Sequence, residues 1–156
     1  MNDTIMVTVL TPTYNRAKTL PKLIESLYSQ TSTNFQWLVI DDGSTDDTDS
    51  IFERLKNYDL PFQWEYHKKE NGGKHTALNF AHAYIKGEVA LILDSDDYLT
   101  SDAIETVEEE WPQYRDQVDI CGMSFFKGKK DGSHLSVANA QDVYLSLIHI
   151  SEPTRL

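Results

Sequence analysis

The sequence is poor in cysteine, in positive charge and in long hydrophobic runs, and each shortage excludes a class of protein. Only Cys121 of 156 residues is a cysteine, which excludes a disulfide framework and any zinc site built from several cysteines. The 14 Lys and Arg residues stand against 25 Asp and Glu residues, so the formal charge is −11 and the chain repels a nucleic-acid backbone. The longest apolar runs, such as residues 89–93, are far below the roughly 20 residues that span a bilayer, and no signal peptide opens the chain. We therefore expect a soluble, reduced, intracellular domain that binds no nucleic acid and has no transmembrane segment.

The remaining composition is that of an ordinary globular domain. Hydrophobic residues make up 40% and charged residues 25% of the chain. Apolar runs rich in β-branched residues predict strands, and apolar residues at helical spacing predict helices that alternate with them. The expected strands cover 5–10, 35–40, 62–67, 88–93 and 118–126, and the expected helices cover 20–28, 45–55, 77–85, with Gly87 as its stop, and 102–111. This alternation predicts an α/β fold with a mostly parallel sheet and helices on both faces.

The C-terminal segment looks unlike the rest. Residues 145–155, LSLIHISEPTR, look like the in-frame translation of a common transposase sequencing adapter, although a natural short strand and turn would also fit. We therefore divide the chain into a domain over 1–144 and a non-native tail over 145–156. On this interpretation the natural protein continues beyond Tyr144 and the chain is a truncated N-terminal piece.

Polar clusters follow three of the expected strands. They are TPTYNR at 11–16, DDGSTD at 41–46 and DSDD at 94–97. In parallel α/β sheets, ligands bind beyond the carboxyl ends of the strands. We therefore expect the three clusters to meet at one edge of the sheet, although they are far apart in the sequence.

The last cluster places three carboxylates within four residues. Asp94, Asp96 and Asp97 would raise one another's pKa unless a cation joined them, and carboxylate oxygens suit Mg²⁺ or Mn²⁺. The alternative is a helix N-terminus decorated with acids. Three acids directly behind a buried strand favour the metal.

The other clusters can hold the parts of a nucleotide. Behind the turn at Gly43, Asp42 can accept a hydrogen bond from a base or a ribose, or else close an Asx turn. The loop at 11–16 supplies a hydroxyl, an aromatic ring and a guanidinium, which can hold a base and a phosphate, or else is a plain surface loop. Residues 71–74, NGGK, can offer backbone N–H groups and Lys74 to a diphosphate.

Together these motifs resemble those of family 2 glycosyltransferases. The resemblance covers residues 5–126 and is carried by 7–16, 38–46 and 87–97. It implies a GT-A fold with a Rossmann-like nucleotide-binding half, so residues 1–144 would be the N-terminal part of a catalytic domain. It also implies transfer of a sugar from a nucleoside diphosphate to an acceptor hydroxyl, with inversion at the anomeric carbon.

The resemblance further implies individual roles. The 94–96 segment matches the DxD motif of the family, with a Mn²⁺ or Mg²⁺ held by Asp96 and Asp97. Asp42 matches the residue that contacts the base. The implied nucleotide-binding residues are Thr11, Pro12, Tyr14, Arg16, Asp41, Asp42, Lys74, Asp94 and Ser95.

One part of the family pattern is missing. Inverting members use a later carboxylate as general base, and no acid after Asp97 has the expected context. We therefore assign no catalytic residue and expect this chain to bind its donor but to transfer sugar negligibly. The alternatives are a non-catalytic nucleotide-sugar binding module and a metal-dependent phosphatase; the phosphatase is disfavoured because no acid follows the first strand.

The resemblance also bears on partners and location. We expect a UDP-sugar donor, a glycan or lipid-linked acceptor and a role in cell-surface polysaccharide synthesis. The expected location is cytoplasmic, with attachment to the inner face of the membrane left open.

Overall fold

The computed structural model describes residues 4–118 and 148–149. Its elements are, in order, β1 (Val7–Thr13), α1 (Leu20–Tyr28), β2 (Phe35–Asp41), α2 (Thr48–Leu55), β3 (Gln63–Lys68), α3 (Lys74–Ala81), β4 (Val89–Ile92), α4 (Ala103–Glu110), the 3₁₀ turn η1 (Trp111–Gln113) and β5 (Ile148–His149). The strand expected over 118–126, together with Cys121, lies outside the described residues apart from Val118. None of the described helices is long and apolar enough to cross a membrane.

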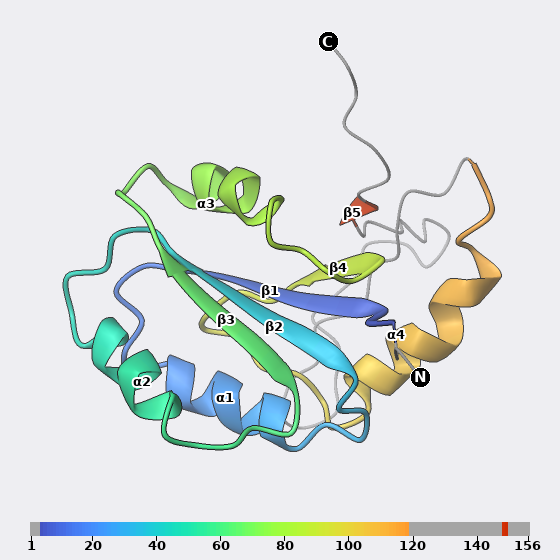
Figure 1. Cartoon of the computed structure of the whole chain (residues 1–156), viewed down its shortest axis with the longest axis horizontal. Helices are drawn as coiled ribbons and strands as arrows, with labels where there is room; N and C mark the ends of the chain where they lie inside the picture. Colours follow the sequence, from blue (N-terminus) through green and yellow to red (C-terminus); the bar gives the residue numbers. More distant parts are fainter. Residues whose placement is uncertain (1–3, 119–147, 150–156) are drawn as a thin grey trace, which may run out of the picture.

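The sheet has the strand order β3-β2-β1-β4-β5 (Figure 1). The first four strands in this order pair in parallel with one another, and β5 pairs antiparallel with β4. Pairing of β1 with β2 is continuous from Val7↔Phe35 to Thr13↔Asp41, so the two strands end level. The expectation of a mostly parallel sheet is therefore confirmed, and two residues of the segment set apart as a tail pair with its edge.

Helices cover both faces of the sheet, as expected. Figure 1 shows α3 on one face and α1 with α2 on the other. The larger apolar core joins β1 and β2 to α1, α2 and α4 through side chains such as Val9, Leu23, Trp37, Phe52 and Trp111. The smaller core places Ala77 and Ala81 of α3 against Leu10, Leu38 and Ile40. All residues of β1 and β2 are buried because both faces are covered, which explains their continuous apolar runs.

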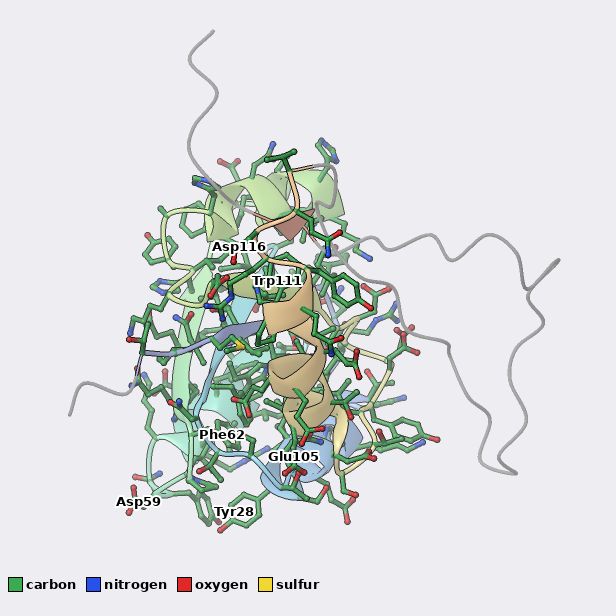
Figure 2. All side chains as sticks on the ribbon, turned by 90° about the vertical axis from the view of Figure 1, so that its right-hand side faces the viewer. Tyr28, Asp59, Phe62, Glu105, Trp111 and Asp116 are labelled. Atoms are coloured by element: carbon green, nitrogen blue, oxygen red, sulfur yellow. The ribbon has the colours of Figure 1, made fainter. Side chains whose placement is uncertain are left out.

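Helix α4 lies along the side of the domain that faces the viewer in Figure 2. It runs between Glu105 in its first turn and Trp111 at its C-terminal end. The Trp111 indole N–H donates to Glu88 Oε1 at 2.8 Å, and Arg115 pairs with the same carboxylate at 3.3 Å. These contacts attach the end of α4 to the residue just before β4.

A buried polar pair fixes the segment that leads into β4. The Thr8 hydroxyl donates to Gln36 Oε1 at 2.8 Å, and the Gln36 amide donates to the Tyr84 carbonyl at 3.0 Å. The Gly87 N–H in turn donates to the Thr8 hydroxyl at 2.9 Å. The side chains of Thr8 and Gln36 thus have partners, and these hydrogen bonds set how closely the segment approaches β1.

The expectation that Gly87 stops a helix is wrong. Helix α3 ends at Ala81, because the chain turns there to bring residues 84–87 onto Gln36 and Thr8. A Cβ at Gly87 would lie 2.5 Å from the Thr8 nitrogen and 2.7 Å from the Val7 carbonyl carbon. Glycine is required there for close packing of two backbones, not for helix termination.

We predict that Gly87→Ala destabilises the domain strongly. The atoms that the new methyl group meets belong to backbone, so no side chain can move aside, and overpacking of this kind costs about 1–3 kcal/mol or more. Chemical denaturation followed by circular dichroism measures the loss. Glu109→Ala, on the exposed side of α4, is the control and should stay within about 0.5 kcal/mol of wild type. Equal stability of the two variants would contradict the close-approach argument.

Candidate functional site

A cavity of about 260 Å³ opens at the carboxyl ends of β1, β2 and β4. Its lining residues are Pro12, Thr13, Tyr14, Arg16, Asp42, Lys74, Ala77, Asp94, Ser95 and Asp96. All three polar clusters contribute, together with the start of α3. The expected convergence of the clusters on one edge of the sheet is therefore confirmed.

Two lining residues were not expected from the sequence. Thr13 is the last residue of β1 and is 3% exposed, and Ala77 lies in the first half of α3. The position of Thr13 inside the first polar cluster could have indicated it. Nothing in the sequence marks Ala77, whose small side chain belongs to the helix face that packs on the sheet.

Three of the expected site residues do not line the cavity. The Thr11 hydroxyl is fully buried and accepts from the Trp37 indole N–H at 3.1 Å. The Asp41 carboxylate, also fully buried, accepts from the Ser44 N–H at 2.8 Å and the Tyr66 hydroxyl at 2.6 Å. The Asp97 N–H donates to the Asp94 carbonyl at 2.9 Å in the turn after β4. Thr11 and Asp41 are therefore placed where they support the strand ends.

The loop after β1 is fastened to the loop after β2 by Asn15. Its backbone has the positive φ of 52° that Asn tolerates better than most residues. Its side-chain oxygen accepts the N–H groups of Thr45 at 2.8 Å and Asp46 at 3.3 Å, and its own N–H donates to the Ser44 hydroxyl at 2.9 Å. This fastening holds the flanking Tyr14 and Arg16 at the cavity.

Asp42 sits in a cradle of donors from the loop between β3 and α3. Its Oδ1 accepts from Lys69 Nζ at 2.6 Å and the Gly72 N–H at 3.0 Å, and its Oδ2 accepts from the Gly73 N–H at 2.6 Å. Burial would raise the pKa of Asp42, but these hydrogen bonds and the Lys69 charge outweigh it and lower the pKa below its ordinary value of 3.8. Asp42 is therefore ionised at neutral pH.

The cradle changes the expectation for residues 71–74. The two glycine N–H groups, which the sequence suggested for a diphosphate, donate to Asp42 instead. The loop also approaches the turn after β2 so closely that a Cβ at Gly43, which has a φ of 81°, would lie 2.9 Å from the Asn71 nitrogen. Lys74 remains the member of this segment that lines the cavity beside Ala77.

Opposite charges alternate around the cavity. Lys74 pairs with Asp94, and Arg16 lies 3.6 Å from Asp96. The four side chains are between 39% and 54% exposed, so these ion pairs contribute little stability. Both cations are therefore available to an anionic ligand, and both carboxylates to a cation.

The acids after β4 do not form a closed metal cage. Within residues 4–118 and 148–149, no three His, Cys, Asp or Glu side chains are grouped to hold a metal ion. Mg²⁺ commonly takes only one or two carboxylates and completes its shell with phosphate oxygens and water. Asp94 and Asp96, both at the cavity, fit that kind of open site.

Comparison with known proteins identifies the family. The sequence pattern of the protein family described as glycosyl transferase family 2 matches residues 8–150. The chain belongs to this glycosyltransferase family. It is 29% identical over 147 residues to the glycosyltransferase GlyG of Streptococcus pneumoniae, covering 94% of this chain and 48% of GlyG. It is also 29% identical to the poly(ribitol-phosphate) β-N-acetylglucosaminyltransferase TarS of Staphylococcus aureus, covering 95% of this chain and 26% of TarS. The chain thus spans about half of GlyG and less of TarS.

Solved structures of other sugar transferases share the fold. The structure of S. aureus TarS residues 1–349 with UDP-GlcNAc has a TM-score of 0.62 and 30% identity, over 70% of this chain and 32% of that one. A mannosyltransferase from Pyrobaculum calidifontis, in complex with GDP-Man and Mn²⁺, has a TM-score of 0.65 and 25% identity, over 79% of this chain and 35% of that one. The fold is GT-A.

The support beneath the site includes Tyr66, whose hydroxyl contacts the carboxylates of Asp41 and Asp49. Burial and these carboxylates raise the pKa of Tyr66 well above its ordinary value, so the hydroxyl keeps its proton. Lys68 Nζ donates to Asp49 at 2.6 Å and to the Ser44 carbonyl at 2.8 Å. This network joins the end of β3 to the loop and helix that follow β2.

We predict that Tyr66→Phe lowers the free energy of unfolding by about 1–3 kcal/mol. The variant keeps the ring but removes the hydrogen bond that Tyr66 donates to the fully buried Asp41 carboxylate. The acceptor atom is then buried without this partner, which costs free energy because water cannot replace the hydrogen bond. Urea denaturation provides the measurement. Tyr58→Phe, which removes a hydroxyl from a side chain 67% exposed, is the matched control and should change little. A Tyr66→Phe domain as stable as the control would show that the network does not hold the strand ends.

Proposed function

We propose that the chain binds a nucleoside diphosphate sugar in the cavity, and that the protein to which it belongs transfers the sugar to an acceptor hydroxyl. The observation that carries this proposal is the meeting of an ionised acceptor, Asp42, two accessible cations, Arg16 and Lys74, and two carboxylates, Asp94 and Asp96, around one cavity. The complexes of related proteins with UDP-GlcNAc and GDP-Man support it. We favour a UDP-sugar as the donor.

Each part of the donor has a matching group in the lining. Asp42 accepts a hydrogen bond from the base, and Tyr14, 47% exposed at the cavity, offers its ring for stacking. Arg16 and Lys74 bind the diphosphate oxygens, since their present partners are half-exposed carboxylates that hold them weakly. Ser95, 5% exposed, lies between the two acids in the same wall.

Binding of the diphosphate redistributes the charges of the cavity. When the phosphates take Arg16 and Lys74, the carboxylates of Asp96 and Asp94 lose their ion-pair partners and face an anion. This arrangement favours a divalent cation, Mn²⁺ or Mg²⁺, which Asp96 and Asp94 would hold, with Asp97 next to them in the sequence. A cation bound there would supply positive charge to offset the negative charge of the departing diphosphate. Arg16 and Lys74 act in the same sense, since their positive charges stabilise the leaving group.

We also propose the course of the reaction, the acceptor and the biological role. The reaction is a single displacement with inversion, the acceptor is a glycan or is linked to a lipid, and the role is in cell-surface polysaccharide synthesis. The similarity to TarS, a poly(ribitol-phosphate) β-N-acetylglucosaminyltransferase, supports a polymeric acceptor. A cytoplasmic location stays a prediction.

We predict that UDP binds this chain at least tenfold more tightly with Mn²⁺ than in chelator, a difference of about 1.4 kcal/mol. Asp96→Asn should abolish most of the difference, because it removes a charge that the cation offsets. Isothermal titration calorimetry with and without Mn²⁺ makes the measurement. Asp116→Asn, an exposed acid after α4, makes the same charge change and should keep the metal effect. Equal affinity for UDP in both conditions would refute the metal part of the proposal.

A second candidate function is donor binding without transfer. It is favoured by the pairing of every described carboxylate in the lining, Asp42, Asp94 and Asp96, with a lysine or arginine. Asp42 is held in its ionised form by its hydrogen bonds and by the Lys69 charge, so it is a poor general base, and in the proposed donor complex Asp94 and Asp96 face the diphosphate and its cation. On this view the base that activates the acceptor is contributed by residues other than those of the described lining.

We predict that the 156-residue chain binds UDP but turns over donor sugars about 10² to 10⁴ times more slowly than TarS, because no carboxylate of the described lining is placed as a general base. A donor-turnover assay with UDP- and GDP-sugars, run beside full-length TarS with its own acceptor, makes the comparison. Acceptor-dependent turnover at a rate close to that of TarS would locate the base within this chain.

A further inference from the structure

A lysine outside the cavity lining is mostly buried against one of the lining residues, Asp42. The Lys69 side chain is 16% exposed, and its ammonium contacts Asp42, whose side chain is 6% exposed. Lysine is rarely buried, because its charge loses hydration, and a buried charge needs a full set of partners. Lys69 has them: its Nζ donates to Asp42 Oδ1 at 2.6 Å, to the Thr76 hydroxyl at 2.8 Å and to the Glu70 carbonyl. The three donors of the ammonium are thereby used, and the side chain is fixed.

The cradle also decides how much of Asp42 is left for a ligand. A carboxylate offers about four acceptor positions. Lys69 and Gly72 take the two positions of Oδ1, and Gly73 takes one position of Oδ2. About one position, on Oδ2, therefore remains for a donor that enters the cavity, and Asp42 lines that cavity.

We propose that Lys69 is a positioning residue for base recognition, which keeps Asp42 an ionised, fixed acceptor and so makes the site select bases that present a ring N–H. Uracil and guanine present such a group, whereas the corresponding ring nitrogen of cytosine is an acceptor. The proposal rests on the proposed function, because it concerns the base of the same nucleotide. It means that Lys69, which does not line the cavity, contributes to the base specificity of the residues that do.

The charge of Lys69, and not only its hydrogen bond, is what the site needs. Burial by itself favours the neutral form of Asp42, and a protonated Asp42 could donate to the ring nitrogen of cytosine. The Gly72 and Gly73 N–H groups favour the ionised form but carry no net charge. The two cations of the lining are Arg16 and Lys74, and they are paired with the other two acids of the lining, Asp96 and Asp94. Lys69 is therefore the cation that forms an ion pair with Asp42.

The experiment compares wild type with Lys69→Met, titrating UDP and CDP in chelator, so that no metal ligand contributes, over a range of pH. Wild type should prefer UDP to CDP. In the variant we expect the preference to fall about tenfold, because the remaining acceptor is no longer fixed and ionised. We also expect the pH below which UDP binding fails to rise by about 1–3 units, the usual effect of removing an opposite charge from beside an Asp. Protonation of UDP itself is the same in both experiments, so a difference between the pH profiles of the two proteins comes from the site.

Lys56→Met is the matched control, because it removes the same charge from an exposed side chain paired with Glu53 on α2. It should leave both the preference and the pH profile unchanged. Circular dichroism shows whether each variant is folded. If Lys69→Met does not fold, Lys69→Gln, which keeps a donor without the charge, replaces it with the same expected results.

The outcomes separate this inference from the proposed function. Failure of wild type to bind UDP would overturn the proposed function and the inference with it. Wild type that binds UDP and CDP equally would overturn the inference alone. A folded Lys69 variant that binds both nucleotides more weakly by the same factor at every pH would also overturn it, because that is the result of a merely structural role.

Discussion

The level pairing of β1 with β2 is the constraint on which the rest of the structure depends. Backbone hydrogen bonds along two fully buried strands fix Thr13 opposite Asp41, so the polar loops that follow them begin at the same height. Strand β4 joins the other side of β1 in parallel, and the acids after it therefore reach the same edge. A slip of one residue in either pairing would turn the buried side chains to the opposite face and separate the loops. The cavity is a consequence of strand register.

Buried polar groups complete the site from behind. Asp41, Thr11 and Tyr66 lie beneath the lining, and each uses its polar atoms on a neighbouring strand or loop. Asp42, one residue further along, is held from the β3–α3 loop by a lysine and two backbone N–H groups. The two consecutive aspartates thus have different roles: Asp41 supports the strand end, and Asp42 presents a hydrogen-bond acceptor to the cavity. Alternation along an extended chain points neighbouring side chains in opposite directions, which explains the division.

The ion pairs at the cavity differ in how far they are exposed to water. The Asp42–Lys69 pair is mostly buried, and removal of either partner leaves a charge with little hydration. The Arg16–Asp96 and Lys74–Asp94 pairs are half exposed and can open at small cost. One pair is thus suited to hold a fixed shape, and the other two are suited to exchange partners when a charged ligand enters. This contrast is the physical basis of the proposed donor site.

The sequence alone determined the fold class, the order of strands and helices, the family and the three loops that form the site. These features depend on apolar periodicity and on short motifs, which are local and can be recognised without contacts between distant residues. Only the tertiary structure decided that Gly87 is a close-approach glycine and that the glycines of 72–73 serve Asp42 and not a phosphate. It likewise showed that Asp41 faces Tyr66, that Lys69 stands behind Asp42, and that the acids after β4 pair with Arg16 and Lys74. The physical reason is that a side chain's partners are set by strand register and loop path, which bring together residues more than twenty positions apart.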